Sequence, residues 1–217
     1  MNFLAAAHAA AGAAPCSLLE ASATQTSLTV AGVLRRGGEA QVQRALNEAG
    51  VPASAATLRL SPFDGPYCGA LDIVRQVAAD AGMPPQVQIL GTLPLQRNDL
   101  LRLDVTMPPS AGYLYVSYLM KSNEIVHLVP SQPQPGGVRV RLGEPAPNFP
   151  GWEVDEPYGT DLVLVFASER PLFPRPRPLL EPLNDFMPAL TEALRNARAQ
   201  GARVAARAIV VETVERR

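Results

Sequence analysis

The residues best suited to chemistry form an acidic run in the second half of the chain, where Glu153, Asp155, Glu156 and Asp161 lie close together. Paired carboxylates can act as general acid and base in glycoside hydrolysis, or they can bind calcium. On a strand, however, Glu153 and Asp155 share one face while Glu156 lies on the other. We interpret the run as a solvated rim, with a hydrolase site as the alternative.

Histidine is scarce, with only His8 and His127 in 217 residues. A metal site needs clustered His, Cys, Asp or Glu side chains, so we predict no metal site. The sequence also lacks the G-x-S-x-G element and the glycine-rich phosphate loops, and no catalytic residue or cofactor site is predicted. Because His127 precedes a turn at Pro130, we expect it to be a structural, hydrogen-bonding residue.

Cys16 and Cys68 are the two cysteines of the chain. An even pair flanked by apolar residues favours one disulfide that ties the N-terminal arm to the start of a helix, which indicates an oxidising compartment. Two alternatives stay open. The thiols could be reduced and buried, or Cys68 could be a nucleophile served by His127, although nothing around Cys68 marks one.

Composition excludes several classes of protein. With 19 basic and 20 acidic residues the formal charge is −1, which argues against a nucleic-acid binder or a polybasic membrane-binding segment. No stretch approaches the ~20 apolar residues of a membrane span. The alanine-rich start lacks the basic and leucine-rich regions of a secretion signal, so residues 1–15 are predicted to be a flexible leader, and we expect any membrane anchor to lie before residue 1.

Residues 16–95 are predicted to form a small αβ domain. Hydrophobic periodicity favours alternating strands and helices in this part of the chain, at 27–35 (strand), 39–49 (helix), 57–63 (strand), 64–82 (helix) and 85–93 (strand). The stretch LTVAGVLRRGGEAQVQRALNEAG followed by ATLRLSPF resembles the bacterial BON module, a family linked to binding at envelopes and phospholipid surfaces. Arg44 stands beside Glu39 and Glu48, so the helix lacks the basic face that lipid binding favours.

Residues 96–217 are predicted to form a β-sandwich with a proline-rich strap and a C-terminal helix and strand. Short strand-like runs separated by Pro, Gly, Asn or Ser are typical of this architecture, and they occur at 100–108, 111–120, 124–131, 137–143, 151–157 and 160–168. The apolar run Asp161–Ala167 predicts a central strand covered on both faces. Prolines between 171 and 182 favour an extended strap, followed by a helix over 183–200 and a strand over 202–217. The fold class is therefore α+β.

Four aromatic residues form the candidate binding surface: Tyr113, Tyr115, Trp152 and Tyr158. Tyr113 and Tyr115 share one face of a strand, where they could contact a partner or be covered by the strap. Trp152, the only tryptophan, could anchor the core or stack on a ligand.

Three landmarks resemble a bacterial family of unknown function found in envelope proteins. They are GYLYV at 112–116, HLVP at 127–130 and a Pro-x-Gly-x-[DE] run that closes in Ser-x-[RK]-Pro-Leu at 157–172. Members commonly lie outside the cytoplasm, behind the membrane span of a serine/threonine kinase or beside a caspase-like peptidase. The resemblance implies an accessory or sensing module rather than an enzyme, and no kinase motif occurs in this chain.

Together these features predict a non-enzymatic periplasmic or extracytoplasmic module that senses or binds an unknown protein or small ligand of the bacterial envelope. A structural or accessory subunit of an envelope or secretion assembly is the alternative. A hydrolase built on the acidic run is a further one.

Overall fold

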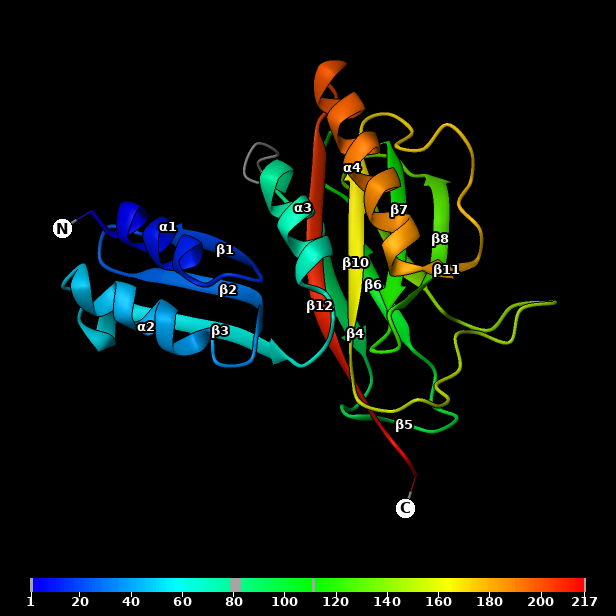
Figure 1. Cartoon of the computed structure of the whole chain (residues 1–217), viewed down its shortest axis with the longest axis horizontal. Helices are drawn as coiled ribbons and strands as arrows, with labels where there is room; N and C mark the ends of the chain where they lie inside the picture. Colours follow the sequence, from blue (N-terminus) through cyan, green and yellow to red (C-terminus); the bar gives the residue numbers. More distant parts are fainter. Residues whose placement is uncertain (1, 79–82, 111, 217) are drawn as a thin grey trace.

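The computed structural model describes residues 2–78, 83–110 and 112–216, and it is an α+β protein, as predicted (Figure 1). Its first part, here called the N-terminal unit (residues 2–63), is a three-stranded sheet covered by two helices. Its elements are α1 (Phe3–Ala13), β1 (Ser17–Ala23), β2 (Leu28–Arg35), α2 (Glu39–Glu48) and β3 (Ala56–Phe63). The strand order is β1-β2-β3, with β1 and β2 antiparallel and β2 and β3 parallel.

The flexible leader predicted for residues 1–15 is wrong over its described part, because it forms the helix α1. Asn2 caps this helix by accepting a hydrogen bond from the Ala5 amide at 3.0 Å. Three alanines, Ala6, Ala7 and Ala10, are buried against the rest of the unit. Alanine has the highest intrinsic helix propensity, and its small side chain permits close packing.

Strands β1 and β2 of the N-terminal unit approach each other closely at Gly32. At Gly32 the backbone φ is +135°, and a Cβ there would lie 2.2 Å from the carbonyl oxygen of Leu18. Only glycine satisfies both conditions, so the glycine within this predicted strand permits the close contact between β1 and β2.

The second part, here called the larger unit (residues 67–216), contains a six-stranded sheet in the order β11-β8-β7-β10-β12-β5. The helices α3 and α4 pack on one face of this sheet, and a three-stranded sheet in the order β4-β6-β9 packs on the other. The bounds are α3 (Cys68–Ala78), β4 (Gln86–Leu90), β5 (Leu95–Gln96), β6 (Arg102–Thr106), β7 (Tyr113–Leu119), β8 (Glu124–Pro133), β9 (Arg139–Leu142), β10 (Thr160–Ser168), β11 (Leu180–Pro182), α4 (Leu183–Ala199) and β12 (Val204–Val214).

The central strand predicted from the apolar run is confirmed. In β10 the residues Leu162 and Leu164 belong to the core beneath the helices, whereas Val163 and Val165 belong to the core between the two sheets. The helix predicted at 183–200 is also confirmed as α4, and its apolar stripe is buried.

The strand predicted at 85–93 is present as β4, but it pairs antiparallel with β6 of the larger unit and does not complete the N-terminal unit. One other strand prediction is wrong. The run 151–157 is not a continuous strand, since it has only the isolated bridge between Leu100 and Glu153. The end of the helix predicted to residue 82, and the predicted strand ends at 111 and 217, lie outside the described residues.

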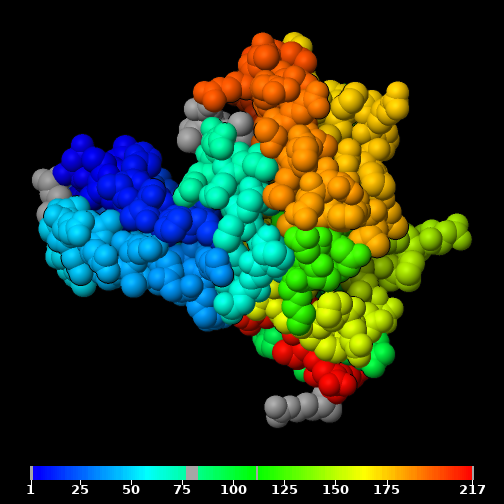
Figure 2. Space-filling view, in the orientation of Figure 1, coloured from blue at the N-terminus to red at the C-terminus, as the bar shows by residue number. Residues whose placement is uncertain are grey.

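The two units are joined by a disulfide and by a shared core. Cys16, just before β1, is bonded to Cys68 at the start of α3, which confirms the predicted pairing. Leu18, Val33 and Phe63 of the N-terminal unit belong to the same hydrophobic cluster as α4 and the large sheet. The space-filling view shows the N-terminal unit projecting from the larger unit beside α3 (Figure 2).

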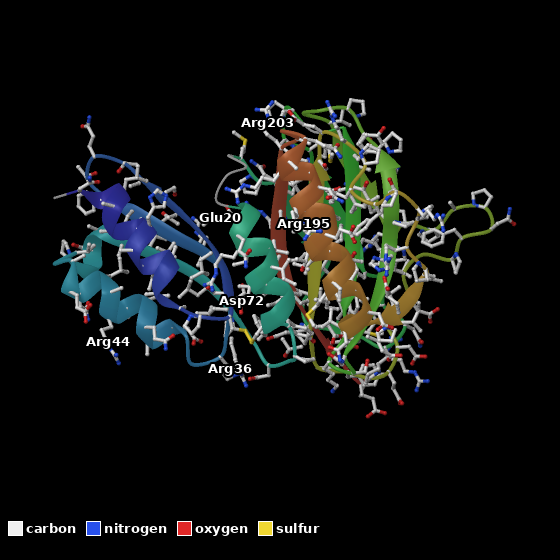
Figure 3. The ribbon with its side chains drawn as sticks, turned by 45° about the horizontal axis from the view of Figure 1, so that its top comes forward. Glu20, Arg36, Arg44, Asp72, Arg195 and Arg203 are labelled. Atoms are coloured by element: carbon white, nitrogen blue, oxygen red, sulfur yellow. A yellow bond between two sulfur atoms is a disulfide. The ribbon has the colours of Figure 1, made fainter. Side chains whose placement is uncertain are left out.

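An ion pair also crosses this junction. Arg207 of β12 lies 2.8 Å from Glu20 of β1, and Glu20 is labelled beside α3 in Figure 3. Because both side chains are partly exposed, this pair contributes less to the junction than the buried apolar residues and the disulfide.

Removing the disulfide is expected to destabilise the protein. The bond closes a loop with a sequence separation of 52, for which chain entropy predicts a stabilisation of about 4 kcal/mol. The double variant C16A/C68A should therefore lose about this free energy of unfolding in urea denaturation. Wild-type protein treated with a reducing agent should match it, and an unchanged unfolding midpoint in both would contradict the assignment.

Candidate functional site

A cavity of about 300 Å³ lies on the face of the six-stranded sheet away from α3 and α4. Its walls are mainly apolar and include Leu101, Val126, Leu128, Val154 and Val211. Two aromatic side chains, Tyr118 and Trp152, complete the lining, together with four carboxyl groups described below. A concave, mostly apolar space with a few convergent polar groups is the usual form of a ligand-binding site.

Asp161, at the beginning of β10, is the buried polar group of the cavity. Its side chain is 3% exposed and accepts three hydrogen bonds. The Tyr118 hydroxyl donates at 2.8 Å and the Lys121 backbone amide at 3.1 Å. The Tyr67 hydroxyl shares its proton between the Thr160 carbonyl oxygen at 2.9 Å and Asp161 at 3.3 Å. These donors come from β7, from the turn that follows it and from the residue before α3, so one carboxyl group connects three separate segments.

Burial raises the pKa values of the ionisable groups in this network. Desolvation raises the pKa of Asp161 above its ordinary value, although the hydrogen bonds that it accepts favour the ionised form. Desolvation first, and the neighbouring Asp161 carboxyl second, raise the pKa of Tyr118 and of Tyr67 far above the usual phenol value. Both phenols therefore stay protonated at neutral pH and act as donors.

The segment leading into β10 is fixed by its contacts with β12. Gly159 and Thr213 exchange hydrogen bonds, since each backbone amide donates to the other residue at 3.0 Å or less. Lys121, the only lysine, bonds through its ammonium group to the carbonyl oxygen of Tyr158. These contacts position Asp161 at the inner end of the cavity.

The other carboxyl groups of the predicted acidic run, Glu153, Asp155 and Glu156, are exposed and line the same cavity as Asp161. Backbone hydrogen bonds hold this segment against residues 98–101. Arg97 lies 3.6 Å from Asp155, with both side chains largely exposed. The structure thus brings together the four acids that the sequence analysis singled out, three of them at the rim and one inside.

Trp152 is half-buried. Its side chain packs against the core and also lines the cavity. Its ring packs against Gly143, where a Cβ would come within 2.9 Å of the indole Cε3 atom. The Phe149 ring meets it nearly perpendicularly, with ring centroids 6.5 Å apart. The orientation of the indole is therefore fixed by its neighbours.

The four aromatic residues proposed as a binding surface do not form one surface. Trp152 and Tyr158 pack against the core between the two sheets, whereas Tyr113 and Tyr115 pack against the core beneath the helices. Tyr115 is buried, and its hydroxyl accepts a hydrogen bond from the Leu172 amide at 2.8 Å. Of the two alternatives for Tyr115, the structure shows the one in which the strap covers it.

A second polar group, whose members were not predicted to lie together, is buried beneath the strap. His127 lies 3.0 Å from the Ser117 hydroxyl through Nδ1 and 2.8 Å from the Glu181 carboxyl through Nε2. Arg177 also bonds to Glu181. In the sequence, the polar Ser117 within an apolar strand was the one indication of this buried group. Glu181, the second partner of His127, is 54 residues away from it along the chain.

This Ser-His-Glu group resembles a nucleophile with its base, but its burial argues for a structural role. Ser117 and His127 are each 3% exposed and Glu181 is 7% exposed, so a substrate from solution does not reach the hydroxyl. Glu181 belongs to β11 and therefore fastens the end of the strap to the sheet.

Comparison of the chain with protein-family models, with curated proteins and with solved structures finds no match. Within the described residues, no group of three His, Cys, Asp or Glu side chains could hold a metal ion. No helix in that same part of the chain has the length and apolar character needed to cross a membrane.

Replacing Asp161 by alanine should destabilise the fold. The variant leaves the Tyr118 hydroxyl and the Lys121 amide without their acceptor, while relief from burying the carboxyl offsets part of this cost. We expect a net loss of about 2 kcal/mol in chemical denaturation. D161N, which keeps an acceptor oxygen, should lose less. The exposed control D155A should stay within about 0.5 kcal/mol of wild type, and a D161A variant as stable as this control would contradict the assigned network.

The buried His127 should make stability depend on pH. Desolvation lowers the pKa of His127 below its ordinary value. For Glu181, burial opposes ionisation, but the hydrogen bonds from Arg177 and His127 outweigh it and lower the pKa. The unfolded chain thus binds more protons, and stability decreases as pH falls below the unfolded histidine pKa of about 6.5.

The check is the urea midpoint at pH about 7 and pH about 5. Wild type should lose more stability over this interval than H127Q, which has no titrating group at the position. Equal losses in the two proteins would show that His127 does not contribute to the pH dependence.

Proposed function

We propose that this chain is a non-enzymatic binding module of a bacterial envelope signalling protein, with the cavity beside Trp152 as its ligand site. The single observation that carries the proposal is the cavity itself, in which apolar walls surround a buried, hydrogen-bonded Asp161. This combination provides burial for an apolar group and a polar group that fixes its orientation.

Two further observations support the compartment and the context. The Cys16–Cys68 disulfide is consistent with an oxidising, extracytoplasmic location. The landmarks at 112–116, 127–130 and 157–172 resemble an envelope family whose members accompany serine/threonine kinases. On this proposal the module is periplasmic, and it recognises its ligand while a separate domain carries any catalysis.

A hydrolase is the second candidate, because Asp161 shares its cavity with three exposed carboxyl groups. The hydrogen bonds of Asp161 weigh against this candidate. Its two oxygens already accept from three donors, which leaves it poorly placed to protonate a leaving group. Turnover of chromogenic glycosides that disappears in D161N would favour the hydrolase over the binding module.

Trp152 provides the test, since it is the only tryptophan and it lines the cavity. Its emission should change saturably with at least one of four probes, the acetylated amides of leucine, phenylalanine, arginine and glutamate. The variant V126F, which places a ring in the cavity from a half-buried position, should abolish the change. V138F, at an exposed position outside the cavity lining, is the matched control and should respond as wild type does.

The proposal fails if none of the four probes produces a saturable change. It also fails if V126F responds as wild type does while its circular dichroism spectrum shows an intact fold, because the probe would then bind elsewhere.

A further inference from the structure

We propose that the cavity receives the side chain of an arginine from a partner polypeptide. This inference rests on the proposed function and specifies its ligand. It depends on three properties of the cavity, namely its charge, its aromatic wall and its opening to the surface.

The charge of the cavity lining is entirely negative. Glu153, Asp155, Glu156 and Asp161 line it, and no basic side chain is among its described lining residues. Two cations lie near these carboxyl groups. Arg97 pairs with Asp155, itself one of the four, at 3.6 Å, and the Lys121 ammonium bonds to the Tyr158 carbonyl oxygen. The other lining carboxyl groups, Glu153, Glu156 and Asp161, still favour a cationic ligand and disfavour an anionic one.

The walls select a cation with an apolar stem. Leu101, Val126 and Leu128 present aliphatic surface, on which the methylene groups of a long basic side chain are buried while its charged end stays near polar groups. A compact inorganic cation would leave this surface unused and would find no cluster of three ligands in the described residues. The apolar area therefore argues for an organic cation.

Arginine fits the polar groups better than lysine does. The planar guanidinium stacks on an indole, and Trp152 is held in a fixed orientation at the wall. The same group can donate to two carboxylates at once, one at the rim and one inside the cavity at Asp161, whose Oδ2 atom accepts from Tyr118 and has a second acceptor position. Burial of Asp161 strengthens this attraction, because a carboxylate out of water gains more from a nearby cation.

The opening indicates that the arginine belongs to a polypeptide. The rim acids Glu153, Asp155 and Glu156 are exposed, so they lie where the ligand leaves the cavity. Phe149, in contact with Trp152, is also partly exposed and adds apolar surface beside the opening. A ligand that fills the cavity with a side chain and continues as main chain contacts all of these groups.

The test compares tripeptides in which acetyl-Ala-X-Ala-amide carries arginine, lysine, citrulline or glutamate at X, with Trp152 emission as the readout. Citrulline has the shape of arginine without its charge. We expect the arginine peptide to bind at least about tenfold more tightly than the citrulline peptide, and to weaken as salt concentration rises. The glutamate peptide should not bind.

The double variant E153Q/E156Q, at two exposed positions, should reduce affinity for the arginine peptide about tenfold. The matched control is E48Q/E192Q, which removes two exposed acids on α2 and α4 outside the cavity lining and should bind as wild type does. Because both double variants change the net charge by the same amount, unequal effects exclude a general effect of net charge.

Each contrary result has a separate meaning. Equal binding of the citrulline and arginine peptides overturns the cationic ligand but leaves the cavity as a binding site. Tighter binding of lysine than of arginine overturns the stacking argument. Ethylguanidinium binding as tightly as the arginine peptide overturns the polypeptide partner. If no peptide and no amino-acid amide alters Trp152 emission, both this inference and the proposed function fail.

Discussion

β10 (Thr160–Ser168) is buried on both of its faces, and this burial determines the arrangement of the larger unit. Leucines on one face require the cover of α3 and α4, while valines on the other require the cover of the three-stranded sheet. Its neighbours β7 and β12 satisfy its backbone hydrogen bonds on either side. Since a strand covered in this way has little freedom to move, residues at its ends are suited to hold polar groups in fixed positions.

Asp161 occupies such a position, and its burial would be costly without its three donors. The cavity therefore combines a rigid buried carboxyl with an exposed acidic rim. On the opposite face of the sheet, Ser117, His127 and Glu181 form another buried hydrogen-bonded group. This group holds the proline-rich strap against the sheet, because the strap has few backbone donors of its own. Buried polar networks therefore hold both the segment at the beginning of β10 and the end of the strap against the six-stranded sheet.

The sequence predicted the features that depend on local pattern. The continuous apolar run of β10, the periodic stripe of α4 and the pairing of two cysteines were all correct. It failed where the pattern was uninformative, since the alanines of α1 provide little contrast between faces and β4 carries no mark of its partner strand. Trp152 and Asp161 were identified, but Tyr67, which lies 94 residues from Asp161, was not, because contacts at that separation leave no periodic trace.

Tyr67 connects the cavity structurally to the junction between the units. Its hydroxyl bonds to Asp161, and the next residue, Cys68, carries the disulfide to Cys16. A ligand whose affinity changes when the junction loosens must, by reciprocity, change the free energy of loosening by the same amount. Residues 2–63 contribute none of the described lining residues of the cavity, so such a coupling would reach them through the disulfide, the shared core and Tyr67 together.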